Sequence, residues 1–213
     1  MTGRQPMLIV LSGPPCSGKT TLAAMLSRRR EHPHLQMDRF RSGLLPWSHH
    51  GRIAIDFAYW TMHRTASILL RLDRSVVLDS TYARTQQRSD VELIAKHSDA
   101  SLYLIECVVT PQEAVSRFLH RPLGHAACDL TDGRVDTLAR TFPYSLAGLC
   151  LDTTNSIGSC LECIDTYLLG VPLSPDVWSA SGRLSSTNLL GSHAAGSAGS
   201  GHPDPKSKLS SAS

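Results

Sequence analysis

The chain has 213 residues, a formal net charge of +3 and 41% hydrophobic residues. This length suits one domain with a substantial core, and no apolar run reaches the roughly 20 residues that a membrane-spanning helix needs. A charge this small does not by itself indicate nucleic-acid binding. The N-terminal apolar run is too short for a signal peptide, so the expected location is cytoplasmic.

Apolar strands alternate with helical stretches over the first 170 residues. The predicted strands are Met7–Ser12, Leu35–Asp38, Ser75–Leu78, Ser101–Val108 and Gly148–Asp152. The predicted helices are Gly18–Arg30, Arg52–Arg71, Arg84–His97, Pro111–His120, Asp132–Thr141 and Ser156–Leu169. Strands separated by helices favour an α/β fold, in which helices cover both faces of a parallel sheet.

The composition changes after residue 170. Residues 171–213 are rich in Ser, Gly, Ala and Pro, and such a segment cannot bury enough apolar surface to offset the entropy of ordering it. We therefore expect one domain over 1–170 and a disordered tail over 171–213. A docking role for the tail through Trp178 and Leu189-Leu190 remains an alternative.

A phosphate-binding motif follows the first predicted strand. Residues 13 to 20 read Gly13-Pro14-Pro15-Cys16-Ser17-Gly18-Lys19-Thr20, the P-loop pattern G-x-x-x-x-G-K-[ST], and Thr21 continues into the first predicted helix. Backbone N–H groups of such a loop surround phosphates, and the helix N-terminus adds positive potential. Lys19 is expected to reach the β- and γ-phosphates, and the Thr20 hydroxyl to ligate Mg²⁺. The expected cofactors are ATP and Mg²⁺.

A carboxylate and an arginine follow the second predicted strand. Asp38 lies about twenty residues after the P-loop lysine, and Arg41 comes three residues later. Ligands bind at the carboxyl ends of strands in open α/β sheets, so Asp38 is placed to accept a proton from an attacking hydroxyl. Arg41 would either hold an anionic group of the acceptor or steady Asp38.

The third predicted strand leads into Asp79-Ser80-Thr81. Asp79 could act on Mg²⁺ through water or orient the acceptor, and the two hydroxyls could hydrogen-bond the acceptor. No glutamate follows Asp79, which weakens an ATP-hydrolase interpretation. The guanine-binding pattern N-K-x-D does not occur, which weakens a GTPase interpretation further.

Two arginines four residues apart, Arg117 and Arg121, would share one face of the helix that Pro122 ends. A loose stretch follows, and Asp129–Asp132 could cap a second helix. Helix, turn and helix with arginines on one face indicate a kinase lid, in which the arginines stabilise charge on the transferring phosphoryl group.

In order and spacing, the P-loop, D-x-x-R, the strand ending in Asp79 and R-x-x-x-R resemble the polynucleotide kinase, chloramphenicol phosphotransferase and zeta-toxin group of P-loop kinases. The segment Gly148–Thr154 resembles the last strand of that group, which leads to a loop near the adenine. The resemblance covers about residues 5 to 170. It implies a five-stranded parallel sheet of order 2-3-1-4-5, a small helical lid and Mg-ATP-dependent phosphorylation of a hydroxyl.

The sequence leaves the acceptor open between a nucleic-acid end, an antibiotic, a sugar nucleotide as in a zeta-toxin-like kinase, and another small molecule. We expect Ile53, Phe57, Trp60 and Ile68 to face the core, which makes Trp47 the better aromatic candidate for acceptor binding. A nucleotide-binding regulatory module with little turnover is the alternative. Such a module needs Lys19 but not Asp38, Arg117 or Arg121. The sequence does not identify a protein partner.

Overall fold

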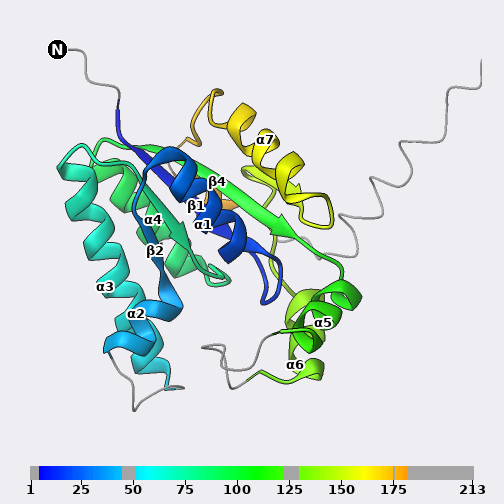
Figure 1. The fold of residues 1–213 in the computed structure, drawn as a ribbon. Coiled ribbons are helices and arrows are strands. Elements are labelled where there is room, and N and C mark those ends of the chain that lie inside the picture. Colours follow the sequence, from blue (N-terminus) through cyan, green and yellow to red (C-terminus); the bar gives the residue numbers. More distant parts are fainter. Residues whose placement is uncertain (1–4, 45–50, 122–129, 175, 182–213) are drawn as a thin grey trace, which may run out of the picture.

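The computed structural model describes residues 5–44, 51–121, 130–174 and 176–181. A single parallel sheet with strand order β2-β3-β1-β4-β5 organises this part of the chain (Figure 1). The strands are β1 (Met7–Ser12), β2 (His34–Gln36), β3 (Val76–Asp79), β4 (Ser101–Val108) and β5 (Leu149–Asp152). The α/β fold and the strand order 2-3-1-4-5 are therefore confirmed.

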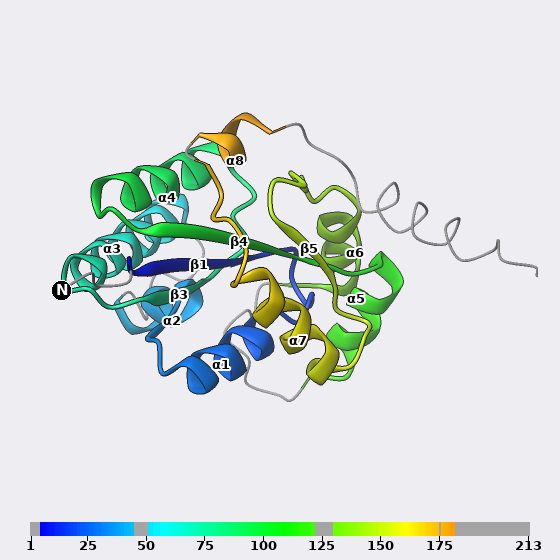
Figure 2. The same cartoon turned by 90° about the horizontal axis from the view of Figure 1, so that it is seen from above.

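Helices cover both faces of the sheet. They are α1 (Lys19–Arg30), α2 (Met37–Leu44), α3 (Arg52–Arg71), α4 (Thr85–His97), α5 (Pro111–Leu119), α6 (Asp132–Arg140), α7 (Ile157–Tyr167) and α8 (Val177–Ala180). Viewed from above, α1 and α7 lie on one side of the sheet, whereas α3, α4 and α8 lie on the other (Figure 2). Within the described ranges, no helix combines the length and apolar character needed to cross a membrane.

The central strand shows why both faces are covered. Every residue of β1 is buried, and its side chains alternate between two cores. Leu8 and Val10 belong to the cluster beneath α3, α4 and α8, whereas Ile9 and Leu11 belong to the cluster beneath α1 and α7. Burying each of these side chains stabilises the fold by about 1.5–3 kcal/mol.

The second strand ends earlier than expected. We predicted a strand over Leu35–Asp38, but β2 stops at Gln36 and α2 begins at once, so Asp38 lies in the first turn of a helix that we did not predict. Met37 and Arg41 are the buried positions of α2, one turn apart. They give the helix one inward face, and α2 packs against α3.

The core-facing side of α3 is not the one we predicted. Ile53, Phe57, Trp60 and Ile68 are exposed, with Ile53 at 86% and Trp60 at 58%. The buried face consists instead of Ala54, Ala58, Tyr59, Met62, His63, Ala66 and Leu70. Small alanines let α3 lie close to the sheet, which leaves the larger apolar side chains on the outer surface.

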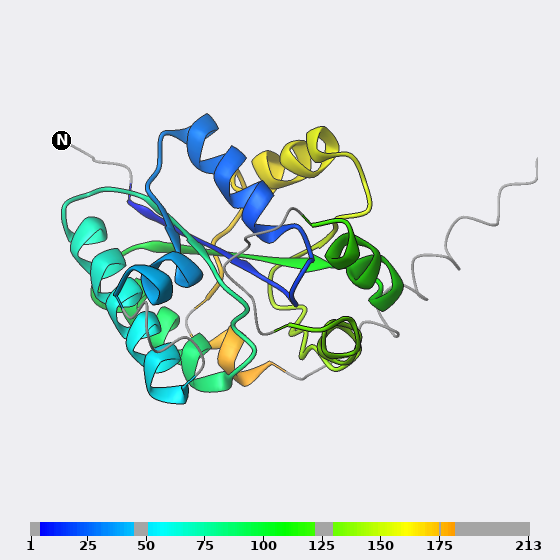
Figure 3. The ribbon, with the colours of Figure 1, turned by 60° about the horizontal axis from the view of Figure 1, so that its bottom comes forward.

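The ordered chain extends beyond residue 170, where we expected a disordered tail to begin. Residues after α7 cross back over the sheet, and α8 lies beside α4 (Figure 3). Trp178 is fully buried in the α3–α4 core, and its backbone N–H donates to Glu92 Oε1 at 2.7 Å. The predicted boundary at residue 170 is therefore wrong. Leu189-Leu190 and Trp47 lie outside the described residues.

Candidate active site

The P-loop joins β1 to α1 in the arrangement that the motif predicts. Gly13 and Gly18 have positive φ angles of 154° and 81°. A Cβ at Gly13 would lie 2.7 Å from the carbonyl oxygen of Cys107 and 2.7 Å from Ser17 Oγ, so only glycine fits there. Lys19 begins α1, and its Nζ donates to the carbonyl oxygen of Pro14 at 2.9 Å.

Two further P-loop side chains lie deep in the loop. Ser17 is fully buried, and within the described structure its Oγ has no hydrogen-bond partner. A buried hydroxyl that can still donate a hydrogen bond is suited to an anionic ligand. Cys16 has a φ of 64° and packs into an apolar cluster with Ala114 of α5 and Val135 of α6. Burial raises the pKa of the Cys16 thiol, against the opposing charges of Arg121, Lys19 and Arg117.

Asp38 and Arg41 form an ion pair on α2. Arg41 Nη2 lies 3.2 Å from Asp38 Oδ1, and the Arg41 side chain is buried whereas the carboxylate is partly exposed. Both roles expected for Arg41 remain predictions, and the ion pair is compatible with the one that steadies Asp38. The carboxylate is also in the first turn of a helix, where the helix dipole favours a negative charge.

Asp79 ends β3 and is almost completely buried. Its Oδ2 lies 3.4 Å from His34 Nε2, but neither atom has a hydrogen bond within the described structure. In the part of the chain that the structure describes, no group of three or more His, Cys, Asp or Glu side chains could hold a metal ion. Mg²⁺ needs only one or two protein ligands beside water and phosphate oxygens, so the Thr20 hydroxyl and an Asp79 oxygen without a hydrogen bond fit this ion.

Arg117 is anchored where three segments meet. Its Nε donates to Glu113 Oε1 at 2.8 Å, and its Nη2 donates to the carbonyl oxygen of Thr153 at 2.7 Å. Its Nη1 contacts Thr153 Oγ1 at 3.2 Å and the carbonyl oxygen of Cys16 at 3.5 Å. The guanidinium thus joins α5, the P-loop and the loop after β5. It is held against the P-loop in this structure.

Arg121 lies two residues beyond the end of α5, and its guanidinium stands over the Phe118 ring at 5.8 Å. The two helices expected to form a lid are present as α5 and α6, and they pack against each other through the cluster that contains Cys16. Thr131, within the segment that we expected to cap the second helix, accepts a hydrogen bond from the backbone N–H of Arg134. The loose stretch that we expected between the two helices lies largely outside the described residues.

One pocket of 580 Å³ brings these groups together. Among the predicted site residues, it is lined by Pro15, Cys16, Gly18, Lys19, Thr20, Thr21, Asp38, Arg41, Asp79, Arg117 and Arg121. Gly13, Pro14 and Ser17 belong to the loop but do not line the pocket. Residues from four separate stretches of sequence therefore meet in one cavity at the carboxyl ends of the strands.

The pocket also contains residues outside the predicted set of site residues. Tyr59 of α3 lines it, and its hydroxyl lies 2.5 Å from Ser80 Oγ and 3.2 Å from Thr81 Oγ1. Burial raises the pKa of Tyr59, so the phenol stays protonated. Arg84 and Arg134 also line the pocket. Arg84 follows β3 and Arg134 lies in the first turn of α6, and neither residue belongs to a motif that would have marked it in the sequence.

The sheet order, the P-loop and the surrounding pocket define a nucleotide-binding P-loop protein with a kinase-like fold. Residues 8–144, which are more than half of the chain, match the family described as AAA domain (AAA_33). The chain belongs to this family. No curated protein matches the sequence.

Solved structures with the same fold include kinases. The chain has 23% identity and a TM-score of 0.65 to a protein from Chloroflexus aurantiacus that is assigned as a kinase, over 77% of this chain and 99% of that one. For the APS kinase of Mycobacterium tuberculosis in complex with AMPPNP and APS, the identity is 18% and the TM-score 0.61, over 78% and 99% of the two chains. For a gluconokinase from Sinorhizobium meliloti, the values are 16% and 0.53, over 75% and 89%.

Proposed function

We propose that the protein is a phosphotransferase that moves the γ-phosphoryl group of Mg-ATP to a hydroxyl of a nucleic-acid end or a small molecule. The observation that carries the proposal is the single pocket that holds the P-loop, the Asp38–Arg41 pair, Asp79 and Arg121. A module that only binds nucleotide has no need of a carboxylate and an arginine opposite the phosphate loop.

The P-loop binds and orients the donor. Its backbone N–H groups and the Ser17 hydroxyl hydrogen-bond the phosphates, and Lys19 neutralises charge on the β- and γ-phosphates. The Thr20 hydroxyl and Asp79, directly or through water, would hold Mg²⁺, which would supply positive charge to offset that of the phosphates. Desolvation in the pocket strengthens each of these interactions.

Asp38 acts as the general base. An ionised carboxylate in the first turn of α2 accepts the proton of the acceptor hydroxyl as its oxygen attacks the γ-phosphorus in line. Arg41, bonded to Asp38 Oδ1, fixes the direction of that carboxylate. The hydroxyl cluster of Tyr59, Ser80 and Thr81 provides hydrogen bonds for the polar groups of the acceptor.

The two lid arginines have different roles in this proposal. Arg121 lines the pocket, and we assign to it the stabilisation of charge on the transferring phosphoryl group. Arg117 is already bonded to Glu113, Thr153 and the carbonyl oxygen of Cys16, so it holds the P-loop and the lid in register. It completes the positive surroundings of the phosphates without leaving its partners.

Within the AAA domain family, we place the chain in the polynucleotide kinase, chloramphenicol phosphotransferase and zeta-toxin group. D-x-x-R and R-x-x-x-R support this placement, because both pairs of residues line the pocket. Structural neighbours named as gluconokinase and APS kinase support a hydroxyl-bearing acceptor.

The test is ATP consumption by the purified protein with Mg²⁺, without acceptor and with separate pools of 5′-hydroxyl oligonucleotides, hydroxylated antibiotics, sugars and sugar nucleotides. We expect one pool to stimulate ADP release, and we expect Asp38→Asn to abolish the stimulation. ATP binding in the absence of any stimulated turnover would contradict the phosphotransferase and favour a nucleotide-binding module.

A further inference from the structure

A second cavity of 520 Å³ lies between α3 and α4, next to the candidate active site. Tyr59, Arg84 and Gln87 line both cavities, so the second adjoins the first. No residue of the P-loop lines it. We refer to it as the α3–α4 groove. Neither the proposed binding of ATP by the P-loop nor the proposed role of Asp38 as general base involves this groove.

Positive charge exceeds negative charge in the α3–α4 groove. Its charged lining residues other than histidines are Arg52, Arg64, Arg71, Arg84, Asp56 and Asp90. Four positive and two negative charges leave +2 before any contribution from histidine. The acidic residues already have partners, since Asp56 lies 2.9 Å from Arg84 Nη1 and Asp90 Oδ1 accepts a hydrogen bond from Gln86 at 2.8 Å.

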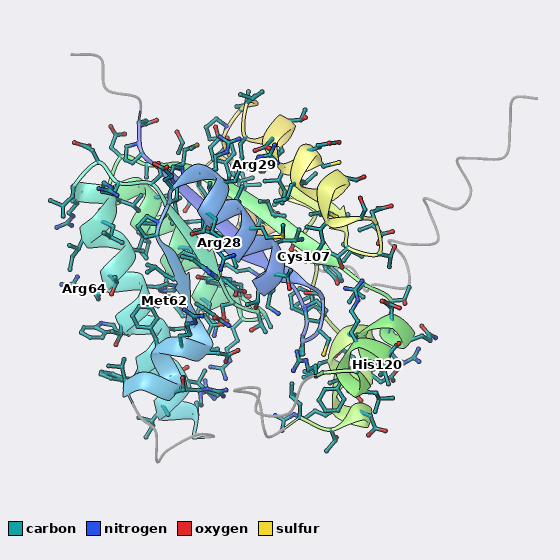
Figure 4. The ribbon with its side chains drawn as sticks, in the orientation of Figure 1. Arg28, Arg29, Met62, Arg64, Cys107 and His120 are labelled. Carbon is teal, nitrogen blue, oxygen red and sulfur yellow. The ribbon has the colours of Figure 1, made fainter. Side chains whose placement is uncertain are left out.

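Two arginines of the groove are available to an external anion. Arg64 and Arg71 are exposed, and no hydrogen bond or ion pair of either side chain is present among the described residues. Arg64 lies on the outer side of α3, whereas Met62 belongs to the core (Figure 4). Arginine is suited to phosphate because its fork of N–H donors matches two phosphate oxygens.

The groove also presents an aromatic surface. Trp60 lines it and is 58% exposed, and its ring stacks on Phe57 with centroids 5.9 Å apart and an angle of 17° between the planes. Phe57 thus supports the indole ring in a fixed orientation. A supported, exposed aromatic ring is the kind of surface on which a nucleobase stacks.

The spacing along α3 suits a ring followed by phosphates. At 1.5 Å per residue, Trp60 and Arg64 are about 6 Å apart along the helix axis, and Arg64 and Arg71 about 10 Å apart. All three side chains line the same groove. A ligand that stacks on Trp60, at the end next to Tyr59, would reach both arginines with successive phosphate groups.

We propose that the α3–α4 groove binds a nucleotide-containing extension of the acceptor, with an aromatic base on Trp60 and phosphates on Arg64 and Arg71. The reacting hydroxyl would lie beside Asp38 in the adjoining cavity. This inference rests on the proposed function, because only a phosphotransferase has an acceptor. Binding of a nucleotide in the groove does not itself require turnover. It selects phosphate-bearing nucleotide ligands over neutral sugars and antibiotics.

The experiment measures equilibrium binding without ATP, in a Lys19→Ala background that removes the P-loop as a competing phosphate site. The probes are a short single-stranded 5′-hydroxyl oligodeoxynucleotide with a fluorescent label and, separately, a nucleoside diphosphate. Arg64→Gln/Arg71→Gln is compared with Arg28→Gln/Arg29→Gln, which removes two charges from α1, outside the groove. Trp60→Ala tests the aromatic contact.

For the oligonucleotide, we expect Arg64→Gln/Arg71→Gln to lower the slope of log affinity against log salt by about 1.4, which is two phosphates at about 0.7 each. Trp60→Ala should weaken binding about 5- to 150-fold, the usual effect of losing one stacked base. The α1 double variant should bind as the background does. Equal affinity and salt dependence in all variants would overturn the proposal.

The two probes separate the sources of the ligand chemistry. Groove-dependent binding of the diphosphate as well as the oligonucleotide supports a small nucleotide extension, whereas groove-dependent binding of the oligonucleotide alone supports a strand. Groove-dependent binding in a protein that never transfers phosphate would refute the kinase and leave the groove intact. Transfer of phosphate to an acceptor, together with unchanged probe binding in the groove variants, would support the kinase and refute the proposed groove site.

Discussion

Arg41 Nη2 lies 3.2 Å from Asp38 Oδ1, one helical turn along α2. The pair is asymmetric, because the arginine is buried and the carboxylate faces the pocket. A buried guanidinium bonded to a partly exposed carboxylate fixes the orientation of the carboxylate. The proposed role of Asp38 as general base can therefore be tested directly by substitution.

Asp38→Asn should lower phosphoryl transfer about 10²–10⁴-fold, the usual contribution of a general base, because an amide cannot take the proton of the acceptor. The affinity for Mg-ATP should stay within a few-fold, measured by titration calorimetry. Asp136→Asn on α6 is the control, since its carboxylate is paired with Arg140 on an exposed helix face. Full turnover in Asp38→Asn would eliminate the assigned role.

Lys19→Ala should weaken ATP binding about 10- to 150-fold, because the phosphates lose a charged hydrogen-bond donor. Lys96→Ala on α4 is the matched control, since that exposed lysine lines neither cavity. The measurement is the dissociation constant of ATP with and without Mg²⁺. An unchanged constant in Lys19→Ala would contradict nucleotide binding by this loop.

Truncation after Gly170 should destabilise the domain strongly, whereas truncation after Ser181 should leave the melting temperature nearly unchanged. The first truncation removes Trp178, which is fully buried against Tyr82, with ring centroids 5.4 Å apart. Trp178→Ala alone should cost about 3–5 kcal/mol of the free energy of unfolding. Equal melting temperatures for the two truncations would show that α8 does not contribute to the core.

His63 should make the protein acid-sensitive. Burial lowers the pKa of His63 from 6.5 to about 4, with Asp90 opposing the shift. Between pH 6.5 and pH 4, His63 binds a proton in the unfolded chain but stays neutral in the folded chain. The free energy of unfolding therefore falls by about 1.4 kcal/mol per pH unit, or about 3 kcal/mol in all, as the pH is lowered through this range. Stability above pH 6.5 is unaffected by this group.

The measurement for His63 is urea unfolding across this pH range. His63→Phe should flatten the decline, whereas His97→Gln, at an exposed position of α4, should not. A variant that declines as steeply as the wild type between pH 6.5 and 4 would exclude His63 as the cause.

Cysteine labelling should discriminate among the thiols of the described residues. Cys163 is exposed, whereas Cys107 is fully buried and burial raises the pKa of its thiol to about 12. Iodoacetamide at neutral pH, followed by mass spectrometry, should therefore modify Cys163 first. Cys16 should react slowly, because burial raises its pKa in spite of the nearby cations. Fast modification of Cys16 would indicate an opening of the α5–α6 cluster.

The parts of the fold that a motif or a buried strand dictates were predictable. Met7–Ser12 and Ser101–Val108 match the structure at both ends, because predominantly apolar runs of this length in an α/β pattern are typical of the central strands of a parallel sheet. The P-loop predicted its own strand and helix, since the chemistry requires both. The order of the strands came from the resemblance, because periodicity does not encode it.

The parts that failed depend on tertiary contacts. Large apolar side chains predicted the wrong face of α3, because Ala54 and Ala58 allow close packing that hydrophobicity alone does not reveal. Composition predicted disorder around Trp178, because a single aromatic that docks into a preformed core leaves no periodic signal. Tyr59 of α3 and Arg84, the residue before α4, line the pocket because of the way these two helices pack. The sequence alone does not determine that packing.

The bonds of Arg117 have an evolutionary consequence. Two of its acceptors, at Cys16 and Thr153, are backbone carbonyl oxygens that no substitution can remove. Sequence drift at either position therefore leaves much of the anchor in place, whereas a change at 117 breaks the link between three segments at once. Position 16 accepts side chains that tolerate a φ of 64° and fit the space that α5 and α6 leave, whereas any substitution at 117 removes every bond of the anchor.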